Sequence, residues 1–187
     1  PTSGSVLYDG REISKLSFDQ MKKLRKELQI VFQDPTSSLN PRKTVRQTLS
    51  QPFLIHELLR TDEIDNRIFE LLEAVKLTPP EQFINRYPHE LSGGQRQRVN
   101  IGRAIALNPR FVVADEPVSA LDVSIRATIL GLLKELQGNL GLTYLFVTHD
   151  LSVVRSLCTR VAVMYLGKMV ELAETREIFT SPAHPYT

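Results

Sequence analysis

The sequence predicts an α/β fold in which a mostly parallel β-sheet is flanked by helices. Short apolar, β-branched segments alternate with segments of helical periodicity over most of the 187 residues, which is the pattern of parallel strands joined by crossover helices. Three of the predicted strands end in polar side chains, at the edge where open α/β sheets bind ligands. A helical stretch over residues 41–95 interrupts the alternation and predicts an inserted subdomain.

Residues 1–40 predict a strand, a helix and a second strand. The segment "GSVLYDG" predicts a strand that ends in an Asp9-Gly10 turn. Ser17, with Gln20 three residues on, predicts a capping box at the start of a short helix. The run "LQIVFQ" predicts a buried strand, and the Pro-, Ser- and Asn-rich segment after it predicts a loop.

The inserted stretch is predicted to be helical. Apolar residues recur at helical spacing from Val45 to about Leu77, and the segment "TPPEQFINRYPHE" breaks the pattern. A helix then begins at Ser92 and runs to about Leu107, where Asn108-Pro109 ends it.

The remaining chain returns to alternating strands and helices. The runs "RFVVADEP" and "LTYLFVTHD" predict buried strands, and the helices "SIRATILGLLKELQGNLG" and "LSVVRSLC" follow them. The segment "VAVMYLGKMVEL" predicts a hairpin that turns at Gly167-Lys168.

Composition excludes several classes of protein. The 42% of apolar and 24% of charged residues are typical of globular domains. A net charge of +2 gives no reason to expect a nucleic acid or an anionic membrane as partner. No apolar run approaches the roughly 20 residues that span a bilayer. The single cysteine, Cys158, cannot form an internal disulfide, which fits a reducing compartment.

Asp115 and Glu116 are adjacent carboxylates at the end of a predicted strand. Two neighbouring carboxylates repel each other, and a cation between them and a polyphosphate would relieve the repulsion. Asp115 suits Mg²⁺, which keeps several waters and needs few protein ligands, and Glu116 could then act on a water as general base. The alternative is a polar strand end that turns at Pro117.

His149 and Gln33 end the other two strands. If the strands are neighbours, His149 lies near Glu116, where a neutral imidazole could contact a terminal phosphate and hold an attacking water. The Gln33 amide could contact both a metal and a water. Taken alone, each residue is better explained as a solvated side chain at a strand end.

The segment "LSGGQRQRV" begins a helix with Ser92 as N-cap, followed by Gly93 and Gly94. Glycines leave the peptide groups bare, and free N–H groups at a helix start favour an anion. This stretch therefore predicts an anion-binding site and leaves the anion open.

The order "VFQ", "LSGGQ", "ADEP" and "VTHD" resembles the nucleotide-binding domains of ABC ATPases, and "SALD" at 119–122 matches the loop after their Asp-Glu motif. Within that family, "FQDPTSSLNPRKTV" and "SPAHPYT" look like the ATP-binding subunits of dipeptide and oligopeptide importers. The resemblance implies a P-loop NTPase-like core made of residues 1–40 and 96–187, and a helical signature subdomain at 41–95.

The resemblance also implies roles for the strand-end residues. Gln33 would contact Mg²⁺ and water, and Asp115 would hold Mg²⁺. Glu116 would be the general base, and His149 would contact the γ-phosphate of ATP.

A second group of residues would serve a partner's nucleotide. Ser92, Gly93, Gly94 and Gln95 would bind the γ-phosphate of an ATP held by the opposite subunit, and Asp122 would lie at the interface between the two domains. Two such domains, head to tail, would enclose two ATP molecules.

One family motif is absent from the sequence. The phosphate loop (Walker A), G-x-x-x-x-G-K-[ST], holds nucleotide phosphates with its N–H groups and lysine. The one Gly-Lys pair in the chain, Gly167-Lys168, is followed by Met169. We expect the loop, the N-terminal strands of the core, including the one before the loop, and the aromatic residue that stacks on adenine to lie upstream of Pro1, and the chain to be a fragment.

The implied function is the ATP-hydrolysing subunit of a di- or oligopeptide importer, with ATP and Mg²⁺ as cofactors. It would sit peripherally on the cytoplasmic face of the inner membrane. Its partners would be a second ATP-binding domain, permease subunits docked on the helical subdomain and, indirectly, a peptide-binding protein. A nucleic-acid ATPase of the same superfamily is the alternative, but it would carry a long coiled coil between Gln33 and Ser92, where this sequence has no sustained heptad. The third hypothesis is that the chain is a non-catalytic interaction module.

Overall fold

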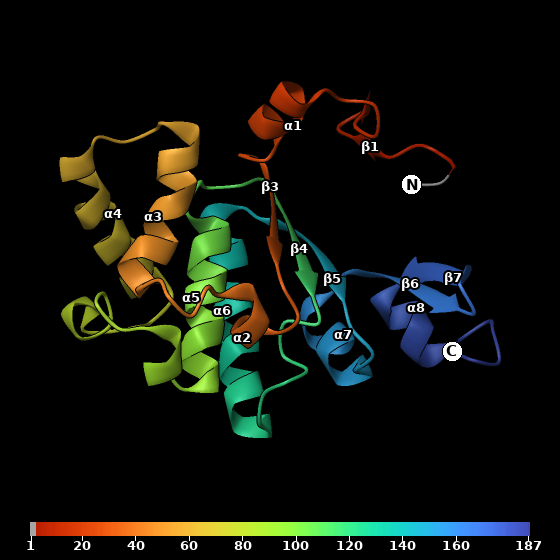
Figure 1. Cartoon of the computed structure of the whole chain (residues 1–187). Coiled ribbons are helices and arrows are strands. Elements are labelled where there is room, and N and C mark those ends of the chain that lie inside the picture. Colours follow the sequence, from red (N-terminus) through yellow and green to blue (C-terminus); the bar gives the residue numbers. More distant parts are fainter. Residues whose placement is uncertain (1–2) are drawn as a thin grey trace.

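A three-stranded parallel sheet lies at the centre of the molecule, in the order β3-β4-β5 (Figure 1). Its strands are β3 (Leu28–Val31), β4 (Phe111–Asp115) and β5 (Thr143–Val147). The computed structural model describes residues 3–187, with side chains for all of them except residues 61 and 62. The first two residues of the expected segment 1–40 therefore lie outside the described part. The parallel sheet confirms the predicted α/β class.

Helices cover one face of the sheet. Helix α5 (Gly93–Ile105) packs on β3 and against α6 (Val123–Leu140), the helix that joins β4 to β5 (Figure 1). Side chains that are at most 1% exposed form one hydrophobic core, which includes Ile101, Val112 and Leu133 and extends into the inserted stretch at Leu49, Ile68 and Leu72. In the described part of the chain, no helix has both the length and the apolar character needed to cross a membrane.

The opposite face of the sheet is open, which corrects the prediction that all three strands are buried. Ile30, Leu145 and Val147 are 36%, 52% and 44% exposed. A cavity of about 920 Å³ lies between this face and the N-terminal hairpin of β1 (Leu7–Tyr8) and β2 (Arg11–Glu12). The strands are apolar on both faces, but the described helices cover only one of them.

The interrupting stretch is helical, as predicted. It contains α3 (Val45–His56) and α4 (Thr61–Ala74), followed by the short 3-10 turns η1 (Pro80–Gln82) and η2 (Pro88–Glu90). Helices α3 and α4 pack against each other and against α5. Since α5 is one continuous helix, it crosses the expected boundary between residues 95 and 96 without a break.

The local signals near the N-terminus are confirmed in part. Helix α1 (Phe18–Leu24) begins with the predicted Ser17–Gln20 capping box. The segment predicted as loop after Gln33 contains a short helix, α2 (Pro35–Ser38). Its start is stabilised by the Asp34 carboxylate, which accepts from the N–H groups of Thr36 at 2.8 Å and Ser37 at 3.2 Å.

The C-terminal part contains α7 (Leu151–Leu157), the predicted hairpin and an additional helix, α8 (Thr175–Thr180). The hairpin strands are β6 (Arg160–Tyr165) and β7 (Lys168–Glu174). Their turn lies at residues 166–167, one residue earlier than predicted, because Lys168 already pairs with Tyr165. Both turn residues have positive φ, 46° and 75°, as a tight hairpin turn requires.

Candidate functional site

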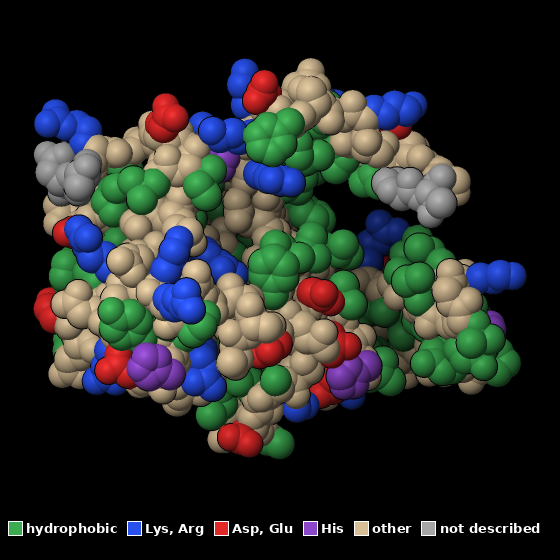
Figure 2. Space-filling view, in the orientation of Figure 1, with side chains coloured by type: hydrophobic (Ala, Val, Ile, Leu, Met, Phe, Trp, Pro, Cys, Tyr) green, Lys and Arg blue, Asp and Glu red, His purple; other side chains and the backbone are tan. Residues whose placement is uncertain are grey.

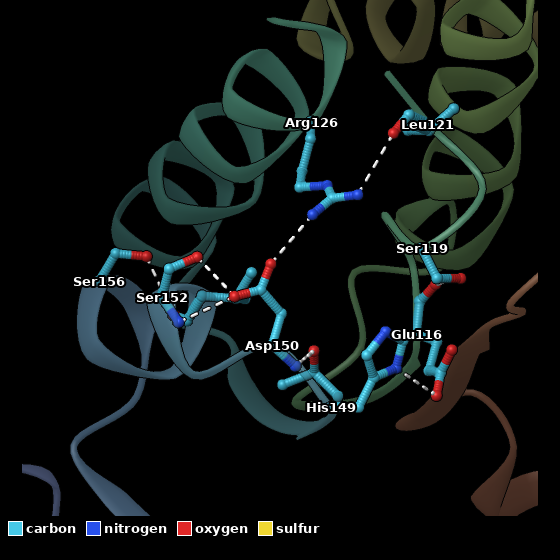
Figure 3. Close-up of polar contacts among 10 residues, drawn as sticks. Glu116, Ser119, Leu121, Arg126, His149, Asp150, Ser152 and Ser156 are labelled. Atoms are coloured by element: carbon cyan, nitrogen blue, oxygen red, sulfur yellow. Dashed lines mark hydrogen bonds and ion pairs between the residues drawn. The ribbon is translucent and has the colours of Figure 1, made fainter. Parts of the chain in front are cut away.

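Three strand-end side chains meet at the carboxyl edge of the sheet. Gln33 Nε2 donates to Glu116 Oε2 at 2.9 Å. His149 Nδ1 lies 3.1 Å from Glu116 Oε1 (Figure 3). These residues follow β3, β4 and β5, and parallel strands bring their carboxyl ends to one edge. The prediction that His149 lies near Glu116 is confirmed.

The backbone of Glu116 is held in an uncommon conformation. Its φ of 41° lies in the left-handed region, which a residue with a side chain rarely adopts and which often marks functional positions. The Glu116 N–H donates to the Val147 carbonyl at 3.0 Å, and Ser119 Oγ donates to the Glu116 carbonyl at 3.0 Å. These bonds fix the turn and with it the direction of the carboxylate.

Hydrogen bonds favour the ionised form of Glu116. The hydrogen bond from His149 lowers the pKa of this carboxyl most, and bonds from Ser119 and Gln33 act in the same direction, against the raising effect of burial. The side chains of His149 and Glu116 are 74% and 24% exposed, so the pair is open to a ligand or a water. An ionised carboxylate held in this way can accept a proton from water.

The same edge offers oxygen ligands that fit Mg²⁺. Asp115 ends β4, opposite Val147 of β5. Because the Gln33 amide nitrogen is bonded to Glu116, its Oε1 is the atom left for a cation. The described residues contain no group of three or more His, Cys, Asp or Glu side chains that could hold a metal. An ion bound by Asp115 and Gln33 would thus keep waters and ligand oxygens, as Mg²⁺ does.

Ser92 caps α5 as predicted, but the helix start is less bare than expected. Ser92 Oγ accepts from the Gln95 N–H at 3.3 Å, and Gln95 Oε1 accepts from the Ser92 N–H at 2.9 Å. The N–H groups of Gly93 and Gly94 make no hydrogen bond within the part of the chain described. These two donors are therefore the ones left for an anion.

The glycines also have a packing role that sequence reasoning missed. A Cβ on Gly94 would lie 2.7 Å from Ile125 Cγ2, and one on Gly93 would lie 3.7 Å from Leu121 Cδ2. Both partners flank Asp122, the exposed N-cap residue of α6. The signature glycines and the loop that carries Asp122 are thus direct neighbours.

The predicted site residues form two groups. Gln33, Glu116 and His149 share hydrogen bonds beside Asp115, whereas Ser92–Gln95 lie beside the loop of Asp122. Among the described side chains, no hydrogen bond joins a member of one group to a member of the other. The resemblance assigns the two groups to two different nucleotides.

Asp150 is a further residue that sequence reasoning did not select. Its Oδ2 accepts from Arg126 Nη1 at 2.9 Å, and its Oδ1 accepts from the N–H and Oγ of Ser152 (Figure 3). The bonds from Ser152 are the main cause of its lowered pKa. The local signal was present, because an Asp two residues before a Ser at a helix start is a typical N-cap.

Comparison with known proteins identifies relatives of the whole chain. The chain is 54% identical over its full length to the oligopeptide transport ATP-binding protein AppF of Bacillus subtilis (strain 168). It is 49% identical to a putative peptide import ATP-binding protein of Brucella ovis. The chain spans 56% and 58% of these proteins, slightly over half the length of each.

Two solved structures share the fold. One is the dimeric post-hydrolysis state of the ATP-binding cassette MJ0796 bound to ADP and Pi, with a TM-score of 0.81, 34% identity, and coverage of 94% of this chain and 75% of that one. The other is cbiO1 from Clostridium perfringens, part of the transporter complex cbiONQ, with a TM-score of 0.82, 34% identity and coverage of 97% and 70%. A family model described as "ABC transporter" matches residues 1–119, more than half of the sequence. The chain therefore belongs to the ABC transporter family.

Proposed function

We propose that the chain is part of the ATP-binding subunit of an ABC importer for di- or oligopeptides, and that Gln33, Glu116 and His149 hydrolyse ATP. The observation that carries the proposal is the pair of contacts, 2.9 and 3.1 Å, that bring two strand-end side chains onto the Glu116 carboxylate. The names of the two relatives support peptides as the transported substrate.

In this proposal Glu116 takes a proton from the attacking water. The water oxygen forms a bond to the γ-phosphorus, and the bond from that phosphorus to the bridging oxygen breaks, which releases ADP and phosphate. His149 fixes the carboxylate through Nδ1 and has Nε2 available for a γ-phosphate oxygen. Gln33 holds the carboxylate from the other side. Mg²⁺, held by Asp115 and Gln33, would offset the negative charge of the phosphates when bound.

The second group of residues would face a partner domain. We assign Ser92, Gly93, Gly94 and Gln95 to the γ-phosphate of an ATP held by a second ATP-binding domain, and Asp122 to the interface. The free Gly93 and Gly94 N–H groups support this assignment, and the solved relative bound to ADP and Pi is a dimer. The sequence contains no G-x-x-x-x-G-K-[ST], so residues of the whole protein outside this chain would supply the phosphate loop.

Residues 41–95 would contact the permease subunits, and the division into segments 1–40, 41–95 and 96–187 remains part of the proposal. The protein would then act peripherally at the cytoplasmic face of the membrane, with the peptide-binding protein contacting it only through the permease. A nucleic-acid ATPase is disfavoured, because α3 and α4 have 12 and 14 residues and form no long arm.

Substituting Glu116→Gln in the full-length protein tests the central role. The change keeps the shape of the side chain and removes its basicity, so ATP hydrolysis should fall by about 10²–10⁴-fold. ATP binding should remain, since no phosphate-binding group is lost. Glu73→Gln, an exposed position on α4, is the matched control and should hydrolyse ATP normally. Turnover within a few-fold of wild type in Glu116→Gln would assign the base to another residue.

A further inference from the structure

Three polar side chains lie along one face of α5, at successive positions three residues apart: Gln97, Asn100 and Arg103. We call them the polar row. Gln97 and Asn100 are fully buried, each 0% exposed, and Arg103 is partly buried. Burying such groups costs folding free energy unless each finds a hydrogen-bond partner. The hydrogen-bond partners of the polar row therefore show which segments of the chain this face of α5 binds.

Two of these partners lie directly beside the proposed hydrolytic residues. Gln97 Nε2 donates to the carbonyl of Pro117 at 2.6 Å, one residue after Glu116. Asn100 Nδ2 donates to the carbonyl of Phe32 at 3.3 Å, one residue before Gln33. Helix α5 thus holds the backbone next to both side chains that share the 2.9 Å hydrogen bond.

The polar row is connected internally, and Asn100 is its central member. Asn100 Nδ2 lies 3.4 Å from Gln97 Oε1, and Asn100 Oδ1 accepts from Arg103 Nη2 at 2.8 Å. Arg103 Nη1 also donates to the Ser38 carbonyl at 2.7 Å, and its guanidinium carbon lies 5.7 Å from the centre of the Phe32 ring. The contacts form an unbroken series from Pro117, after β4, to α2, after β3.

We infer that the polar row positions Gln33 and Glu116, with Asn100 as the residue on which both depend. The inference rests on the proposed function, since it concerns the placement of the residues assigned there. Asn100 touches neither side chain: it acts directly on the Phe32 carbonyl and, through Gln97, on the Pro117 carbonyl. Because α5 is a single helix, a ligand at Gly93 and Gly94 and the polar row act on one rigid element. Binding at the helix start would thereby set the geometry of the Gln33–Glu116 pair.

Variants of Asn100 in the full-length protein test the inference. Asn100→Ala removes every contact of the central side chain. Asn100→Asp keeps its shape and the acceptor for Arg103, but loses the N–H that reaches Phe32. Thr48→Ala is the matched control, because Thr48 on α3 is also buried, 3% exposed, and lies outside the polar row. The measurements are kcat and KM for ATP, thermal unfolding, and amide hydrogen exchange of residues 32–38 and 116–118.

Both Asn100 variants should lower kcat by about 10–100-fold, because small displacements of catalytic groups slow the reaction by such factors. The KM for ATP should change by less than about twofold, because the phosphate-binding groups stay in place. Hydrogen exchange should become faster in both segments. Thr48→Ala should lower the unfolding temperature but should change neither kcat nor hydrogen exchange in the two segments. The inference is wrong if the Asn100 variants behave like Thr48→Ala.

The two proposals can fail separately. If Glu116→Gln hydrolyses ATP normally while the Asn100 variants still speed exchange in residues 32–38 and 116–118, the proposed function is wrong and the polar row still positions both segments. If Glu116→Gln stops hydrolysis but Asn100→Asp leaves kcat and exchange unchanged, the polar row has no positioning role. Hydrogen exchange does not require activity, so it decides the question in any variant that folds.

Discussion

Gly94 lies where two helices approach each other closely. It is buried in the first turn of α5, and Ile125 in the first turn of α6 occupies the space that a side chain at position 94 would need. Any Cβ there would come within 2.7 Å of Ile125 Cγ2, so the Ile125 side chain or one of the two helices would have to shift. A shift of α6 would also move the loop of Asp122, which immediately precedes it. Steric fit is therefore a reason for glycine that is independent of phosphate binding.

Gly94→Ala in the full-length protein should lower the free energy of unfolding by about 1–3 kcal/mol, the usual cost of overpacking. Adding Ile125→Ala should recover part of the loss, because it removes the clashing methyl groups. Gly131→Ala is the control: no atom lies within 4 Å of a Cβ at this helical position, so stability should rise by about 0.5–1 kcal/mol. Chemical denaturation measures the wild type, Gly94→Ala, Ile125→Ala, the double variant and Gly131→Ala. If Gly94→Ala and Ile125→Ala prove simply additive, the packing role is excluded.

The Glu116–His149 contact should be visible in a titration. The hydrogen bond from His149 is the main cause that lowers the pKa of Glu116 in the folded protein. Its contribution to stability is therefore present above the unfolded pKa, about 4.3, and is lost as the pH falls through the lower folded value. His149→Ala should raise the midpoint seen by carboxyl ¹³C NMR for Glu116. Asp65, whose pKa is lowered by Arg46, is the control and should titrate as in the wild type. An unchanged midpoint for Glu116 would contradict the role of His149 in lowering the pKa of Glu116.

Asp150 connects three secondary-structure elements. It follows β5, caps α7 through Ser152 and pairs with Arg126 in the first turn of α6 (Figure 3). The two side chains of the ion pair are 30% and 27% exposed, so solvent weakens their attraction. The cap is therefore expected to contribute more to stability than the ion pair does.

Asp150→Ala should lower the free energy of unfolding by about 0.5–2 kcal/mol through the lost cap, in addition to the ion pair. Arg126→Met, which removes only the charge and its bonds, should cost less than about 1 kcal/mol. Asp19→Ala, in the first turn of α1, is the control for loss of an acidic residue near a helix start. Equal losses in Asp150→Ala and Arg126→Met would show that the ion pair, rather than the cap, dominates.

Local signals predicted most elements because their causes are local. The capping box at Ser17 depends on residues three apart, the N-cap at Ser92 depends on a serine at the helix start, and the strand-end site follows from parallel strands sharing an edge. The open face of the sheet was not predictable, because β5 is apolar at consecutive positions and its pattern does not say which face is covered. The hydrogen bond from Asn100 to Phe32 joins residues 68 positions apart, and no local sequence pattern in either segment predicts it.

At the scale of the whole molecule, the two faces of the sheet differ. One is packed against α5 and α6. The other faces the cavity of about 920 Å³, which is lined by apolar residues of β3, β4, β5 and the N-terminal hairpin together with polar side chains such as Arg25 and Arg110. Figure 2 shows a hollow with hydrophobic side chains around it, between the N-terminal segment and the C-terminal hairpin. The Glu116 site lies at the carboxyl edge between these faces. Among the described residues, the helices packed on the sheet beside this site lie on the α5 side.

The 187-residue chain alone should bind ATP weakly and should not hydrolyse it. It contains the residues assigned to the metal, the water and the γ-phosphate, but no phosphate loop, and its one Gly-Lys pair lies at the β6–β7 turn. Hydrogen bonds to charged groups contribute about 1.5–3 kcal/mol each, so lacking three of them weakens binding by more than about a thousandfold.

A fluorescent ATP analogue titrated with Mg²⁺ into the 187-residue chain and into the full-length protein measures this difference, and phosphate release is assayed beside it. Circular dichroism first establishes that the shorter chain is folded, so that weak binding can be attributed to the missing loop. The full-length protein should bind in the micromolar range while the shorter chain does not saturate, because Gly93 and Gly94 offer only two free N–H donors and the adjacent carboxylates repel the phosphates. Micromolar binding by the shorter chain, or turnover that Glu116→Gln abolishes, would mean that residues within this chain replace the phosphate loop.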